Sequence, residues 1–179
     1  MSSPDFYQFL GIPRRLALDP KELETRLYSL SRKLHPDLFA RKSAAEQSKA
    51  LDDSALLNDA FRTLRDPVKR AEYVLKAEGF DIGEQSTKDV PPELLEEVFE
   101  LNMALEELRM GDDDAREQLE ISRTTFVNMR DEIDVETQSK FAEWDASGER
   151  SVLAEIRALL NRRKYIANLI DKANVPDRV

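Results

Sequence analysis

Apolar residues recur along this chain at intervals of three and four, which is the spacing of one face of an α-helix. The clearest run is Leu23, Leu27, Leu30 and Leu34. No sustained alternation of apolar and polar residues, the pattern of a half-buried strand, competes with this spacing. The chain also has only 5 glycines among 179 residues. The sequence therefore predicts an all-α fold.

Capping residues and prolines bound the first helices. Asp19 followed by Pro20 favours a helix start. Pro36 ends that helix near Leu34, because proline lacks a backbone donor and disfavours helical dihedrals at the residue before it. A polar connector is expected over 40–44.

A second helix is expected from about residue 45 to residue 64. Its apolar face is formed by Leu57, Phe61 and Leu64. Asp66 and Pro67 stop this helix and start a short one that ends near Gly79. Residues 1–78 are thus expected to form one helical unit.

Residues 79–90 lack helical periodicity, so we expect a linker there, before Pro91 and Pro92 open a second unit over 91–173. Three apolar stripes follow, with breaks at Gly111 and Gly148. They are Leu94, Val98, Leu101, Leu105 and Leu108; Ala115, Leu119, Ser122, Phe126, Met129 and Ile133; and Val152, Ile156, Leu159, Ile166 and Ile170. Connections this short predict a three-helix bundle. Its core is also expected to hold Phe141, Trp144 and Tyr165.

Composition excludes most catalytic chemistry. The chain has no cysteine and one histidine, so disulfides, thiol nucleophiles and sites built on two imidazoles or on cysteine ligands are excluded. Only a site made of carboxylates alone stays open, and we expect no enzyme activity, no catalytic residue, no bound metal and no cofactor. No apolar run or leader suits a membrane, which predicts a cytoplasmic protein.

The two halves carry different charge. Residues 1–78 hold 14 Lys and Arg against 12 Asp and Glu, a net charge of +2, whereas residues 79–179 hold 13 against 24, a net charge of −11. A strongly acidic half argues against binding to a phosphate backbone, so no nucleic-acid partner is expected. The same charge is also typical of a solvated helix surface.

The tripeptide His35-Pro36-Asp37 falls between two amphipathic helices. It is followed by Ala60-Phe61-x-x-Leu64 and by Asp66-Pro67-x-x-Arg70-Ala71-x-Tyr73, and it is preceded by Phe6-Tyr7-x-x-Leu10-Gly11-Ile12. In this order and spacing, residues 5–78 resemble the J domain of the DnaJ family. The resemblance implies a non-catalytic co-chaperone whose tripeptide docks on a DnaK-type chaperone and accelerates its ATP hydrolysis.

The chemistry of the tripeptide agrees with that role. Asp37 can accept a charge-assisted hydrogen bond from a partner arginine, and His35 can hold the turn by a local hydrogen bond. At about 100° per residue, Arg26 and Lys33 share an edge off the leucine stripe, which we expect to be exposed and to join the chaperone contact. Solubilising charge is the alternative reading of these cations.

One stretch departs from the general J-domain pattern. Leu27-Tyr28-Ser29-Leu30 stands where J domains commonly carry Tyr, two basic residues and Leu. This departure favours a specialised chaperone partner over the general housekeeping one.

Over its whole length, the chain resembles the HscB family of iron–sulfur co-chaperones, which join a J domain to an acidic helical bundle. The resemblance includes Arg70-Ala71-Glu72-Tyr73-Val74-Leu75 and Gly79-Phe80-Asp81. It implies an HscA-like chaperone and an IscU-type scaffold protein as partners, and a role in maturation of iron–sulfur proteins. A J protein with a different client and a helical adaptor that borrowed the fold are the alternatives.

A second apolar strip lies off the core stripe in 94–110. It consists of Leu95, Phe99, Met103 and Met110, and it is bordered by Glu96, Glu100 and Glu107. We expect Leu95, Phe99, Glu100, Met103 and Glu107 to bind the scaffold protein. Packing of Leu95 and Phe99 against the J domain is the alternative. A monomer is expected, because no second long heptad seam is left unpaired.

Overall fold

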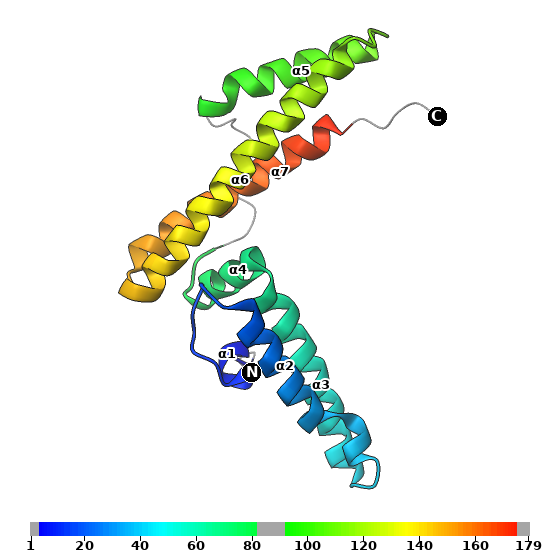
Figure 1. The fold of residues 1–179 in the computed structure, drawn as a ribbon, viewed down its shortest axis with the longest axis vertical. Coiled ribbons are helices and arrows are strands. Elements are labelled where there is room, and N and C mark those ends of the chain that lie inside the picture. The colour runs from blue at the N-terminus through cyan, green and yellow to red at the C-terminus, as the bar shows by residue number, and fades with distance from the viewer. Residues whose placement is uncertain (1–3, 82–91, 175–179) are drawn as a thin grey trace. The chain divides into compact units, whose positions relative to one another are not determined.

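The computed structural model describes residues 4–81 and 92–174, which are mostly helical and contain no strand (Figure 1). The prediction of an all-α fold is confirmed. The chain divides into two compact units, of which the first comprises Met1–Asp81 and Phe141–Gly148 and the second comprises Ile82–Lys140 and Glu149–Val179. Most of the linker expected over 79–90 lies outside the described residues. No helix within 4–81 and 92–174 has the length and apolar character needed to cross a membrane.

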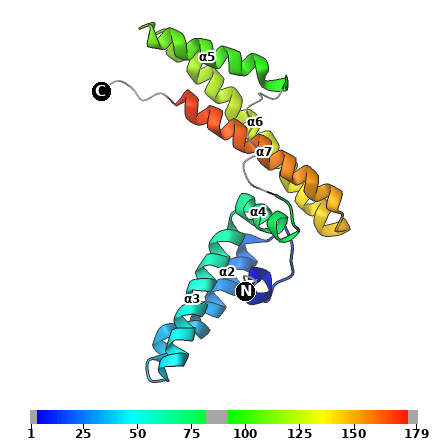
Figure 2. The same ribbon diagram turned by 180° about the vertical axis from the view of Figure 1, so that it is seen from behind.

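The first unit is built on a hairpin of two long helices. Its elements are α1 (Phe6–Leu10), α2 (Pro20–Leu34), the 3-10 turn η1 (Pro36–Phe39), α3 (Ala44–Arg65) and α4 (Pro67–Ala77). Figures 1 and 2 show α2 and α3 side by side, with η1 at one end of the hairpin and α4 at the other. η1 precedes the polar connector expected over 40–44, and α3 begins at the last residue of that stretch, Ala44.

Local capping explains where these helices start. The Asp19 carboxylate accepts the N–H of Lys21 at 2.9 Å, with Pro20 in the first turn. Ser43 and Glu46 form a reciprocal capping box at the start of α3. Each cap satisfies backbone donors that the helix itself leaves unpaired.

The apolar stripes form part of the first core, with a correction on each helix. On α2 only Leu23 is buried, and Leu27, Leu30 and Leu34 are half-buried. Leu23, Leu57 and Leu64 are buried as predicted, but Phe61 is only half-buried and Ala60 is fully buried instead. At about 100° per residue, Ala60 and Phe61 lie on opposite sides of the Leu57 and Leu64 direction, each about 50° from it, so helical phase alone does not decide which of the two is buried. The Phe61 ring lies under the Arg65 guanidinium, 5.9 Å from the ring centroid.

The second unit is a helical bundle. It begins with the 3-10 turn η2 (Pro92–Leu94) and contains α5 (Leu95–Arg109), most of α6 (Ala115–Ser147) and α7 (Arg150–Ala173). Its buried core draws on all three predicted stripes: Leu94, Val98, Leu101, Ala104, Leu108, Ala115, Leu119, Phe126, Ile133, Ile166, Leu169, Ile170 and Ala173. Tyr165 packs against this cluster, as expected.

The expected place of Phe141 in the bundle core is wrong. Phe141 is fully buried, but it belongs to the first unit, where the guanidinium of Arg70 lies 5.9 Å from its ring centroid. In the same unit, the Asp145 carboxylate accepts the N–H groups of Leu16 and Ala17 at 2.7 and 2.8 Å. Helical phase shows that Phe141 needs burial, but it does not show which residues bury it.

Candidate functional site

The backbone of the His-Pro-Asp tripeptide forms a fixed turn at the tip of the hairpin. His35 ends α2 with extended dihedrals (φ −62°, ψ 127°). Pro36 is the first residue of η1, a position where a backbone N–H would have no acceptor within the helix, so the N–H that proline lacks costs no hydrogen bond. The N–H of Leu38 donates to the His35 carbonyl at 3.0 Å. The backbone of Pro36 and Asp37, between these two residues, therefore has little conformational freedom.

The predicted local role of His35 is confirmed. Its Nδ1 atom accepts the N–H of Asp37 at 3.3 Å. A neutral imidazole that accepts through Nδ1 carries its proton on Nε2. His35 therefore closes the turn with a side-chain hydrogen bond in addition to the backbone one.

Asp37 presents an almost fully solvated carboxylate from this turn. Its side chain is 89% exposed, and the titratable group that it contacts within the described ranges is the His35 imidazole, with 3.5 Å between the carboxylate and Nδ1. A carboxylate on a fixed backbone can accept short charge-assisted hydrogen bonds from an arginine or lysine of another molecule. The turn is thus suited to recognising a cation on a protein surface.

The expected basic edge is only half present. Lys33 is exposed, but Arg26 is half-buried and its Nε donates to the carbonyl of Leu10 at 2.5 Å. That carbonyl lies at the end of α1, where helix geometry leaves it without an intrahelical partner. The expectation that Arg26 is exposed is therefore wrong, and Arg26 ties α2 to α1.

Gly11 makes room for this contact. It ends α1 in the left-handed region (φ 64°), and a Cβ atom there would collide with the Arg26 guanidinium. Glycine is thus favoured by the left-handed backbone, and a side chain at this position would displace the Arg26 guanidinium.

α5 has two apolar faces. Leu94, Leu101 and Ala104 are buried in the bundle, whereas Leu95, Phe99 and Met103 are 55%, 64% and 47% exposed. At about 100° per residue, the mean directions of these two sets differ by roughly 170°. The prediction that a second strip stands off the core is confirmed.

Carboxylates border this exposed strip on one side. Glu96, Glu100 and Glu107 are exposed and lie within about 40° of one another around the helix axis, next to the strip. Met110, which follows α5, extends the apolar surface and is 78% exposed. An apolar centre with a charged rim is the usual anatomy of a protein-binding surface.

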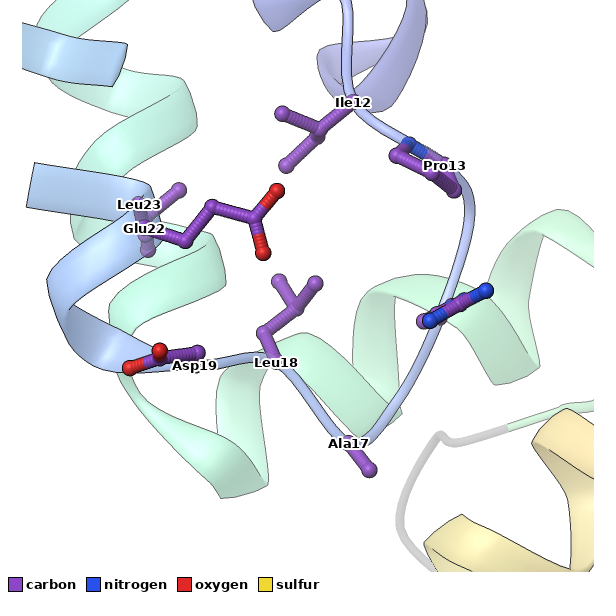
Figure 3. A pocket seen from close by; sticks show the side chains of 8 residues that line it. Ile12, Pro13, Ala17, Leu18, Asp19, Glu22 and Leu23 are labelled. Atoms are coloured by element: carbon purple, nitrogen blue, oxygen red, sulfur yellow. The ribbon is translucent and has the colours of Figure 1, made fainter. Parts of the chain in front are cut away.

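A small pocket lies between the 12–19 loop and the start of α2 (Figure 3). The Glu22 carboxylate points into it between Ile12 and Leu18. The other acidic lining residue, Asp19, already caps α2. The pocket lies at the opposite end of α2 from the His-Pro-Asp turn, and its lining offers no pair of groups suited to catalysis.

Residues 5–73 match the DnaJ domain. These residues form a DnaJ domain. The matched range contains α1 to α3 and the first part of α4, so the His-Pro-Asp turn lies inside the DnaJ domain.

Solved structures resemble this chain beyond the DnaJ domain. Chaperone HscB from Vibrio cholerae is 26% identical, with a TM-score of 0.66 over 95% of each chain. The human co-chaperone protein HscB has a TM-score of 0.71 at 24% identity, over 97% of this chain and 82% of the human one. Together with the DnaJ domain, the match to the Vibrio cholerae structure supports an HscB-type co-chaperone, and the match to the human structure supports the same fold.

Sequence analysis missed part of the tip of the DnaJ domain. Leu38 directly follows Asp37 and is 61% exposed. Arg41 and Lys42 are exposed just beyond η1, in the stretch that was expected to be only a connector. Their position beside the tripeptide was the available sequence signal.

Proposed function

We propose that this chain docks through His35, Pro36 and Asp37 on an Hsp70-type chaperone of the HscA or DnaK kind and stimulates its ATPase. The observation that carries the proposal is the exposed Asp37 carboxylate, held on a closed turn inside a DnaJ domain. Hydrolysis itself takes place in the chaperone.

The turn lowers the cost of docking because it is already in a defined conformation. Pro36 restricts the backbone, and the hydrogen bonds to the His35 carbonyl and Nδ1 close the turn before the partner arrives. Less conformational entropy is then lost when Asp37 meets a cation of the chaperone. Lys33 adds a long-range attraction at the rim, whereas Arg26 acts through the placement of α2 against α1.

We further propose that the exposed strip of α5 holds an IscU-type scaffold protein, so that the chain presents the scaffold to the chaperone during maturation of iron–sulfur proteins. Three features support this: the exposure of Leu95, Phe99 and Met103, the carboxylates Glu100 and Glu107 beside them, and the similarity to HscB structures.

The proposed contact with the chaperone is tested by Asp37→Asn in the full chain. The substitution keeps the shape of the side chain but removes its charge, so stimulation in a single-turnover ATPase assay should fall to the basal rate while the melting temperature stays unchanged. Asp52→Asn, at an exposed carboxylate of α3, is the matched control and should stimulate like the wild type. Full stimulation by Asp37→Asn would refute the proposal.

The proposed binding of the scaffold protein is tested by the triple variant Leu95→Ala, Phe99→Ala and Met103→Ala. Apolar anchors cost roughly 1–2 kcal/mol or more each on truncation, so binding of the cognate IscU-type protein should weaken at least about tenfold. The control truncates two exposed apolar residues of α6, Ile121 and Val135, to alanine.

Three outcomes would count against the proposed binding of the scaffold protein. Normal binding by the stable triple variant would place the scaffold elsewhere. A large drop in its melting temperature would show that the three side chains pack within the protein. Absence of binding by the wild type would favour a different client.

A further inference from the structure

Basic side chains flank the His-Pro-Asp turn on both sides at the tip of the hairpin. Arg32 and Lys33 precede the turn, Arg41 and Lys42 follow it, and all four are exposed. Asp37 is the single carboxylate in residues 32–42, which gives this segment a net charge of +3. No salt bridge joins any of the four to a described residue, although Lys42 adds to the hydrogen bonds from Ser43 in lowering the pKa of Glu46.

Leu38 adds an apolar side chain at the same place. It is one of the exposed large apolar residues of the DnaJ domain, and its backbone N–H is bound to the His35 carbonyl. Its neighbour Phe39 is half-buried, and η1 packs against α3. The turn thus presents Asp37 and Leu38 together from one fixed backbone.

We propose that Leu38 is an apolar anchor of the chaperone-docking surface. We further propose that Arg41 and Lys42 form a basic arm of that surface, on the other side of the turn from Arg32 and Lys33. This inference rests on the proposed function and names the chemistry of its partner. The chaperone should offer a cation for Asp37, an apolar recess for Leu38 beside it, and acidic side chains on both sides of these.

Charge placement in the hairpin supports the basic arm. The middle of α2 reads Leu27-Tyr28-Ser29-Leu30 and carries no cation, and Arg26 is engaged with the Leu10 carbonyl. Within residues 20–42, exposed positive charge that could steer an acidic partner therefore lies mainly at the tip, on both sides of Asp37. An apolar centre within a charged rim combines slow dissociation with fast association.

The anchor is tested by Leu38→Ala in the full chain, with binding to the ATP-bound chaperone followed by surface plasmon resonance. Loss of an apolar contact acts mainly on dissociation, so the dissociation rate should rise at least about fivefold with little change in association. Ile121→Ala, an exposed apolar truncation on α6, is the control and should leave both rates unchanged.

The basic arm is tested by Arg41→Glu with Lys42→Glu. Association should slow about tenfold at low salt, and the difference should vanish near 0.5 M salt because exposed charges are then screened. Lys69→Glu with Lys76→Glu makes the same change in net charge on α4, at the other end of the hairpin, and should have a much smaller effect.

Failure of this inference differs from failure of the proposed function. If Asp37→Asn abolishes stimulation while the Leu38 and Arg41/Lys42 variants behave like their controls, the inference is overturned and the proposed function stands. If Asp37→Asn stimulates normally, the proposed function itself fails. A defect of the charge variant that persists in high salt, with a lowered melting temperature, would also overturn the basic arm.

Discussion

The His-Pro-Asp turn and the exposed strip of α5 are two different ways of building a protein-binding surface. The turn is short and centred on one charged side chain, and its shape is fixed by bonds between residues at most three apart in sequence. The strip is apolar and spreads over more than two turns of a helix whose opposite face is core.

This difference affects what one substitution can do. In the turn, removal of a single charge at Asp37 removes the feature that recognises the partner. On α5, binding is shared among several side chains, so one truncation weakens it only in part. The strip also depends on the bundle, because the core face positions it.

The largest expected effect separates the two faces of α5. Leu101→Ala leaves a cavity in the bundle core and should lower the free energy of unfolding by about 2–5 kcal/mol. Phe99→Ala on the exposed face should change it by less than about 0.5 kcal/mol. Urea denaturation of the full chain measures both, and equal losses would show that Phe99 is core.

A smaller effect is expected at Arg26. Arg26→Gln removes the bond to the Leu10 carbonyl, so α1 should lose about 1 kcal/mol of local stability, or about fivefold in amide-exchange protection. Arg32→Gln, at an exposed cation of the same helix, should leave exchange unchanged. If both variants exchange alike, Arg26 is not a structural residue.

The smallest effect is expected at Lys33. Lys33→Glu should slow association with the chaperone only a few-fold, and the effect should fade as salt rises, because a rim charge acts through long-range attraction. Stopped-flow association at several salt concentrations measures it. A defect that does not depend on salt would contradict a purely electrostatic role for Lys33.

Features governed by short-range rules could be predicted from sequence. Asp19 with Pro20, and Pro36 after Leu34, bound α2 at the residues observed. The second strip of α5 also follows from helical geometry, because Leu95 and Phe99 cannot share a face with Leu101.

Contacts between distant residues could not be predicted in this way. Helical phase places Arg26 off the leucine stripe, but the unpaired Leu10 carbonyl that binds it is sixteen residues away. Phe141 has the spacing of a bundle residue, yet it lies against Arg70 of the DnaJ domain. Such partners depend on which segments the fold brings together.

The central claim, that one chain carries both surfaces and must use them together, is tested by mixing two variants. One carries Asp37→Asn, and the other carries the alanine triple at Leu95, Phe99 and Met103. In a single-turnover assay with the chaperone and the IscU-type scaffold, we predict that the wild-type chain gives scaffold-dependent stimulation and that neither variant nor their equimolar mixture restores it. Full stimulation by the mixture would contradict the claim, because the two surfaces would then work on separate chains.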